Sequence, residues 1–567
     1  MSLILATFSC DDFLDVNQSP NSPTKADLRY LLTAAQQNMT VALSQGNYVG
    51  RDLGVLLNHN VTRESPNRYT AQPNQNGYHN SWNAFYILLP NLEEIIINGA
   101  TQNNWHLVGI AKIMKSFVFM HLVDLWGDVP YTEALQMNET MHPKVDDGAF
   151  IYNQALALLK DAKADFAKTD DGINSIRPGA SDLIYGGNVA NWTRFANTLM
   201  LRMLNNTKKV KSTITGWDGL LAEAMGGDRI TAATNFQFLY SGTRTPADER
   251  MPGFTSSYGT TQHTQYPSPW LYEIMRGYDQ YNTPQNPFAE IIDPRIPWYF
   301  YRQIGPRANL PSGVPGVSYR DNGFISIFFG DESQFAAGTV ISCATLWGLY
   351  PIGGRFDAND PHWFDGWTTT SGISATTPAQ VATSGDAGRA IQKLFTFADL
   401  KFIEAEMMLD GTITGDARAT LKTAIEEAFA HINATSGGRP GAPASIAAAV
   451  RDAYVTAVLN KYDDGTPARK MEIIITQKWI HDVMNPAESF ADIRRTGYPV
   501  IFDPRNPRGG ITPENPNFTT AFGADAVRLT TAIGNFPNSL WYPLEEEFRN
   551  DNLTQKPNES VKVFWHP

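Results

Sequence analysis

Apolar residues recur at three- and four-residue spacing through most of the chain, which is the period of an α-helix with one buried face. One stripe begins at Leu28, and another covers 82–96 with an expected interruption at Pro90, because proline lacks the backbone N–H that a helix needs. Further helices are predicted over 105–125, 148–168, 189–205, 390–409, 415–433, 446–460 and 468–484.

Short polar turns join most of these segments in pairs. Antiparallel pairs of this kind predict packing like that of tetratricopeptide (TPR) repeats, because each pair must stack on a neighbour to bury its apolar face. The fixed period of about 34 residues is not kept. The sequence therefore predicts a mainly α fold, in which TPR-like antiparallel helix pairs pack into one globular unit.

Residues 254–370 interrupt this pattern with Gly, Pro, Asp and many aromatic side chains. This fifth of the chain holds 23 of the 65 aromatic residues, which singles it out. Loops of such composition form either a small satellite core or a binding surface, and the sequence leaves both open. We therefore expect a helical scaffold at about 28–235 and 389–500, a loop-rich binding region at about 236–388 and an irregular C-terminal segment at 501–567.

The composition excludes several classes of protein. The net charge of -12 has the wrong sign for binding nucleic acid, so no nucleic-acid partner is expected. Cys10 and Cys343 are the only cysteines in 567 residues, too few for a disulfide scaffold, a Cys-rich zinc site or an iron–sulfur cluster. The sequence contains no run of 18 apolar residues, so it predicts no membrane-spanning helix.

Catalytic signatures are also missing from the sequence: it contains no P-loop, no G-x-S-x-G, no H-E-x-x-H and no C-x-x-C. A glycosidase needs only two facing carboxylates, so a hydrolase with unmarked carboxylates stays open. Glu404 and Glu406 are two positions apart and point in different directions on a helix, which favours solvated or structural roles.

One loop offers hard oxygen ligands beside a glycine. Asp357, Asn359 and Asp360 could seat a structural calcium ion, although the full EF-hand spacing is lacking. No other cofactor is expected.

The N-terminus resembles the end of a bacterial lipoprotein signal, because an apolar stretch stops at the small Ser9 and is followed by Cys10. Asp11 and Asp12 then resemble the surface-export signal of Bacteroidetes lipoproteins. We expect 1–9 to be the residual signal, Cys10 to be lipidated and 10–27 to be a tether. A vector-derived leader is the alternative.

Several motifs resemble those of the SusD/RagB family, in its SusD-like branch. They occur in the expected order at 10–17, 110–116, 124–131, 293–295, 402–406, 477–480, 490–499 and 541–550. The resemblance implies four TPR-like helix pairs that support a loop-rich face, without known catalysis. It also implies a surface lipoprotein that captures glycans or peptides and delivers them, as a lid, to a SusC-like TonB-dependent transporter in the outer membrane.

The family motifs imply structural roles at helix ends and turns for Trp126, Gly127, Pro130, Arg494 and Arg495. Ligand-binding residues must come from local chemistry, because a pyranose ring stacks its apolar face on Trp or Tyr. The candidates from the aromatic-rich region 254–370 are Trp298, Tyr299, Tyr301, Trp347, Tyr350, Trp363 and Trp367. The candidates from the N-terminal loops are Arg63, Tyr69, Tyr78 and Trp82, of which Trp82 also suits a helix core.

Three hypotheses follow. The first is a transporter-coupled binder of oligosaccharides or peptides, and the aromatic excess favours glycan. The second is a glycoside hydrolase, and the third is a TPR-like scaffold that binds only protein.

Overall fold

A computed structural model gives the fold of the chain. It describes residues 26–46, 48–62, 76–136, 140–168, 178–258, 265–277, 286–302, 323–327, 329, 344–357, 388–436, 443, 445–501 and 535–567.

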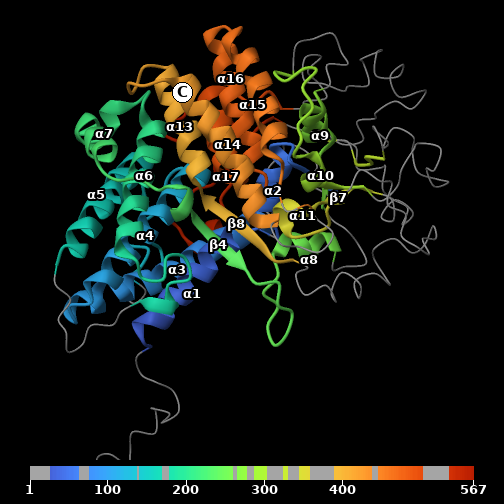
Figure 1. Cartoon of the computed structure of the whole chain (residues 1–567). Coiled ribbons are helices and arrows are strands. Elements are labelled where there is room, and N and C mark those ends of the chain that lie inside the picture. Colours follow the sequence, from blue (N-terminus) through green and yellow to red (C-terminus); the bar gives the residue numbers. More distant parts are fainter. Residues whose placement is uncertain are drawn as a thin grey trace, which may run out of the picture.

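The N-terminal helices pack largely in chain order. Helix α1 lies on α3, α3 on α4, α4 on α5, and α6 on α7, which gives the expected TPR-like stacking (Figure 1). The bounds are α1 Leu28–Ala42, α2 Val49–Leu56, α3 Asn76–Thr101, α4 Trp105–Trp126, α5 Gly148–Phe166, α6 Val189–Thr207 and α7 Trp217–Gly226. The ranges predicted for α4, α5 and α6 are confirmed to within two residues at either end.

Helix α3 continues through Pro90, so the predicted interruption is wrong. A proline inside a helix removes one backbone hydrogen bond and costs roughly 3 kcal/mol. Leu88, Leu89 and Leu92 flank it and are fully buried, in a helix that packs against both α1 and α4. Apolar burial on this scale offsets the lost bond.

A second helical group follows in the C-terminal half and occupies the top of Figure 1. Here α13 packs on α14, α14 on α15, and α15 on α16. The bounds are α13 Phe397–Leu409, α14 Ala417–Ser436, α15 Ala448–Asp463, α16 Pro467–His481 and α17 Pro486–Thr496.

The helix expected from residue 390 begins seven residues later. Residues Ala390–Phe395 form β8, which pairs antiparallel with β4 (Phe236–Tyr240). Thr396 then caps α13: its side chain accepts from the backbone N–H of Asp399, and the carboxylate of Asp399 accepts from the backbone N–H of Thr396. This capping box fixes the helix start at Phe397.

The short helices α8 to α11 and the strand β7 lie beside the helical body, on the right of Figure 1. Three more two-stranded antiparallel sheets are β1–β5, β2–β3 and β6–β7. Their bounds are β1 Asn60–Thr62, β5 Gln265–Pro267, β2 Val129–Pro130, β3 Val145–Asp146, β6 Phe300–Tyr301 and β7 Leu346–Trp347. The short helices are α8 Pro252–Tyr258, α9 Pro269–Arg276, α10 Ile296–Tyr299, α11 Leu349–Ile352 and α19 Leu544–Arg549; three-residue 3₁₀ turns are η2 Gly179–Ser181, η3 Lys211–Thr213 and η4 Ala232–Thr234.

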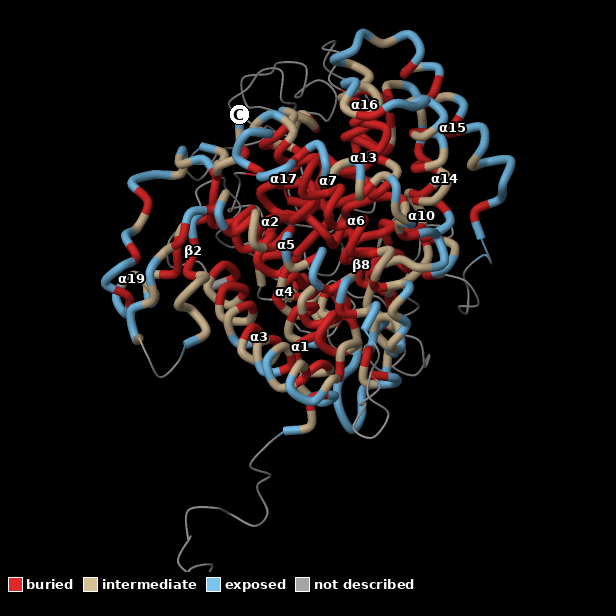
Figure 2. Tube along the Cα trace, turned by 90° about the vertical axis from the view of Figure 1, so that its left-hand side faces the viewer, coloured by how far each residue is buried: buried red, intermediate tan, exposed pale blue. Residues whose placement is uncertain are grey.

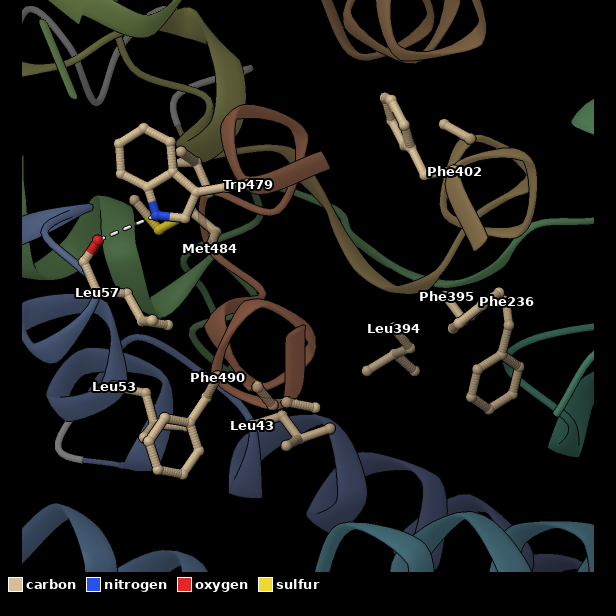
Figure 3. Packing of buried hydrophobic residues seen from close by; sticks show 14 of the residues in the cluster. Leu43, Leu53, Leu57, Phe236, Leu394, Phe395, Phe402, Trp479, Met484 and Phe490 are labelled. Atoms are coloured by element: carbon tan, nitrogen blue, oxygen red, sulfur yellow. Dashed lines mark hydrogen bonds between the residues drawn. The ribbon is translucent and has the colours of Figure 1, made fainter. Parts of the chain in front are cut away.

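The core runs through the middle of the molecule, where α4, α6, α13 and α17 are largely buried (Figure 2). Figure 3 shows one hydrogen bond that connects distant parts of this core: Trp479 on α16 donates its indole N–H to the backbone oxygen of Leu57 at 3.0 Å. Among the described residues, only α4 is long and apolar enough to cross a membrane, and most of it is buried inside the protein. A core helix of a soluble fold passes the same test.

Buried charges join the helices across this core. Arg202 on α6 pairs with Asp124 on α4 and with Glu488 on α17, whose Oε1 lies 3.1 Å from Nη2. Although burial opposes ionisation, the charges of Arg202 and Lys478 lower the pKa of Glu488 to about 2. Arg494 donates to the backbone oxygen of Asp124 at 2.6 Å. The helix-holding role implied for Arg494 is therefore present in the structure.

The acidic pair noted in the sequence also has structural partners. Glu404 pairs with Arg229 at 3.1 Å, and Glu406 pairs with Arg495 and with Lys208. Both carboxylates are therefore engaged in ion pairs between structural elements.

Candidate functional site

Five of the predicted binding residues converge on one aromatic cluster. Trp298 and Tyr299 lie on α10, Tyr301 on β6, Trp347 on β7 and Tyr350 on α11. The β6–β7 pairing brings them together, because it aligns Phe300 with Trp347 and Tyr301 with Leu346.

The rings pack mainly against one another. The centroids of Phe300 and Trp347 are 6.0 Å apart, with an interplanar angle of 25°. Tyr299 and Tyr350 lie 5.0 Å apart, and Trp298 meets Phe356 edge-on at 4.7 Å. Such offset and edge-to-face contacts are the favourable geometries for aromatic pairs. The cluster is therefore at least partly a satellite core.

Burial corrects part of the site prediction. Tyr299 and Tyr350 are completely buried, and Trp347 is 1% exposed. Tyr299 donates its hydroxyl to the backbone oxygen of Ile480 at 3.0 Å, and Lys393 donates to the Tyr350 hydroxyl at 2.7 Å. A ring stacks on a sugar only through an exposed face, so in this structure these three rings support the cluster instead.

Two indole N–H groups in the cluster are buried without a hydrogen-bond partner among the described residues. They belong to Trp298 and Trp347. Buried donors are normally satisfied, so each unpaired donor needs an explanation, and a ligand oxygen is one. Trp298 is 7% exposed, the most accessible of the five predicted residues in the cluster.

Tyr301 is also buried, at 4% exposure, and the guanidinium of Arg355 lies 5.8 Å from its ring centroid. Burial raises the pKa of its hydroxyl, which stays protonated at neutral pH.

Two arginines at the edge of the cluster were missed by the sequence reasoning. Arg302 follows β6 directly, and Arg355 lies close after α11; both are partly exposed. The sequence does place both arginines next to aromatic residues. A glycan site needs hydrogen-bond donors for hydroxyl groups beside its aromatic rings, so this position could have identified them.

Asp357, a predicted calcium ligand, is engaged by Arg302. The Nε of Arg302 donates to Oδ2 at 2.7 Å and Nη2 donates to Oδ1 at 2.8 Å. A guanidinium in this position opposes a cation. Asn359 and Asp360 lie outside the described residues, and among the described ones no group of three His, Cys, Asp or Glu could hold a metal ion.

The N-terminal candidates that can be located lie on α3. Trp82 packs edge-on against Trp126 at 5.3 Å and against Tyr542 at 6.0 Å, so it belongs to the helix core. Tyr78 is 1% exposed, and its buried hydroxyl has no hydrogen-bond partner among the residues that the structure describes. Neither presents a ring to solvent. The remaining predicted residues, Arg63, Tyr69, Trp363, Trp367 and the lipidation candidate Cys10, lie outside the described residues.

A family model described as "Starch-binding associating with outer membrane" matches residues 20–227 and 362–516, well over half of the chain. The chain belongs to the SusD-like family. The aromatic cluster of this SusD-like protein lies between the two matched stretches. The family motifs therefore predicted the helical scaffold but gave no information about the binding residues. No curated protein matches the sequence.

Solved structures share the fold of this SusD-like chain. A chitin-binding protein is 19% identical, with a TM-score of 0.64 over 95% of this chain and 100% of that one. A SusD homologue from Bacteroides fragilis NCTC 9343 is 16% identical, with a TM-score of 0.65 over 95% and 99%. A chitin-binding SusD homologue from Flavobacterium johnsoniae is 18% identical, with a TM-score of 0.62 over 95% and 98%. The predicted TPR-like helical fold is thereby confirmed.

Proposed function

We propose that this protein is a cell-surface binding protein that captures oligosaccharides and delivers them to a SusC-like TonB-dependent transporter. The observation that carries the proposal is membership of a family described as starch-binding and associating with the outer membrane. Two structural relatives are described as chitin-binding, which supports glycan over peptide as the ligand.

The aromatic cluster supports this proposal chemically. Unpaired indole donors and nearby arginines are groups that can hydrogen-bond the hydroxyls of a sugar. Trp298, Arg302 and Arg355 form the described part of the proposed site. From the sequence, Trp363, Trp367, Arg63 and Tyr69 complete it.

The proposal includes a lipid anchor on Cys10 and a covering contact with the transporter. A lipoprotein with several acyl chains stays on the membrane, whereas a single chain anchors only marginally. Cys10→Ala in the full-length gene should release the protein from the outer-membrane fraction. A mild-detergent pull-down from native membranes should recover a much larger β-barrel protein in near-equal amount.

The decisive experiment is a binding panel of chitin, starch and other oligosaccharides together with a peptide digest. Saturable binding of one glycan class without turnover supports the proposal. Turnover would favour the hydrolase hypothesis, peptide binding would change the ligand class, and partner binding without any small ligand would favour the protein-binding scaffold.

A further inference from the structure

A pocket lies away from the aromatic cluster, between the β4–β8 sheet and α14. Its volume is about 220 Å³, below the 300–1,000 Å³ usual for drug-sized ligands. The start of α13 and the residues around η4 close its other sides. The pocket therefore has room for one small ring and not for an extended chain.

One stripe of α14 forms a wall of this pocket. Glu427, Ala430, His431 and Ala434 follow the i, i+3, i+4, i+7 spacing that puts side chains on one helix face. The two alanines are exposed and short, so the stripe leaves space between α14 and the sheet. Apolar carbon lines most of this space, and Glu427 brings the one carboxylate among the lining residues.

The Glu427 carboxylate has no ion-pair or hydrogen-bond partner among the described residues. Its neighbour Glu426 differs in this respect, because it pairs with Lys422 at 2.5 Å. Burial, and then the charge of Glu426, raise the pKa of Glu427. A partly desolvated, unpaired carboxylate favours a cationic partner.

The other charged groups near the pocket do not supply that cation. The charge of Lys401 lowers the pKa of Glu427, but by less than burial or the charge of Glu426 raises it. The Lys401 ammonium donates instead to Glu404 at 2.6 Å. His431 donates Nε2–H to the side-chain oxygen of Gln237 at 3.3 Å, and burial lowers its pKa to about 3. The imidazole is therefore neutral at physiological pH and does not repel a cation.

We propose that this pocket binds a small ligand with a primary ammonium group, such as an amino sugar, with Glu427 as counter-ion. The methyl groups of Ala430 and Ala434 contact the carbon frame of the ligand. This inference is independent of glycan capture at the aromatic cluster, because it uses different residues and a charged group.

The test compares three monosaccharides on the full chain by ligand-observed NMR. Glucosamine, N-acetylglucosamine and glucose share one ring, but only glucosamine carries an ammonium group. We expect glucosamine to bind at least tenfold more tightly than the other two. Its affinity should fall as the pH is lowered toward the raised pKa of Glu427 and the carboxylate takes up a proton.

Variants locate the binding. Glu427→Gln removes the charge at constant shape, and Ala430→Leu fills the space from the exposed rim; each should weaken glucosamine binding at least tenfold. Glu426→Gln is the matched control one residue away: it keeps the Glu427 carboxylate, so glucosamine affinity at neutral pH should stay nearly unchanged, although the pKa of Glu427 loses the contribution of the Glu426 charge. Melting curves verify that each variant is folded.

Equal binding of the three sugars would overturn the ammonium assignment. Absence of glucosamine binding, or binding that survives both Glu427→Gln and Ala430→Leu, would overturn the site. Oligosaccharide binding measured on the same variants should be unchanged, so failure here is distinguishable from failure of the proposed function.

Discussion

Arg495 on α17 and Glu406 on α13 form an ion pair that is almost completely buried. The guanidinium Nη2 donates to Oε2 of Glu406 at 2.8 Å, and Nη1 contacts the other carboxylate oxygen. Both side chains are 1% exposed. The pair therefore joins α13 to α17, the helix that carries the family motif at 490–499.

Arg495→Met should destabilise the fold strongly, because it leaves the Glu406 carboxylate buried with only Lys208 as a cationic partner. Loss of one member of a buried pair costs about 3–5 kcal/mol. Denaturant unfolding measures this change. Arg418→Met is the matched control, because Arg418 and Asp463 form an exposed pair that contributes at most about 1 kcal/mol. Equal losses in the two variants would contradict a special role of the buried pair.

Trp298→Phe should weaken oligosaccharide binding, and it should also lower stability, because the smaller ring incompletely fills a position that is only 7% exposed. The substitution keeps a ring but removes an indole N–H that has no partner in the part of the chain that the structure describes. A lost hydrogen bond to a ligand costs about 0.5–1.5 kcal/mol, or up to roughly tenfold in affinity. Titration calorimetry with the glycan found in the binding panel measures it.

Tyr299→Phe is the control for Trp298→Phe, because it should lower stability without lowering affinity. It removes the hydrogen bond to the backbone oxygen of Ile480, so stability should fall by about 1 kcal/mol while affinity stays unchanged. If Tyr299→Phe reduced affinity and Trp298→Phe did not, the division of the cluster into support and site would be wrong.

Stability should fall as the pH drops from about 6.5 toward 3, in part because His59 is buried. His59 donates Nε2–H to the backbone oxygen of Trp479 at 2.8 Å, and burial lowers its pKa to about 3. Between these pH values the unfolded chain binds a proton at this histidine and the folded chain does not. The free energy of unfolding therefore decreases by up to about 1.4 kcal/mol per pH unit for one such group.

Urea unfolding of His59→Gln between pH 7 and pH 5 checks this slope. Glutamine keeps an N–H donor for the Trp479 oxygen, so the slope should decrease while the fold persists. His431→Gln should lower the slope by a similar amount, because burial also lowers the pKa of His431 to about 3. Slopes equal to that of the parent protein in both variants would show that other groups dominate.

The sequence predicted α4 well because its signals are local. Its apolar positions are continuous, and Gly127 marks the end. It failed at β8 because the partner strand β4 is about 150 residues away, and no local pattern reports that pairing. The strand also runs directly into α13, so one apolar stretch covered two kinds of structure.

The candidate site was predicted by residue type and not by exposure. Aromatic excess located Tyr299 and Tyr350 in one region, and the structure brings them into contact. Their burial depends on Ile480 and Lys393, which are distant in the chain and could not be assigned as neighbours from the sequence. Exposure is a tertiary property, so composition alone overestimates the number of stacking rings.

Gly127→Ala should destabilise the protein through backbone conformation alone. Gly127 ends α4 with φ +82° and ψ -120°, a region that is costly for residues with a side chain. A Cβ at this position would meet Val563 at an ordinary 3.8 Å, so no steric clash contributes. We expect the free energy of unfolding to fall by about 1–3 kcal/mol.

Gly219→Ala inside α7 is the matched control: its Cβ would meet nothing within 4 Å, so it should stabilise the protein by about 0.5–1 kcal/mol. Thermal unfolding of the two variants should give shifts of opposite sign, and shifts of the same sign would contradict the conformational explanation.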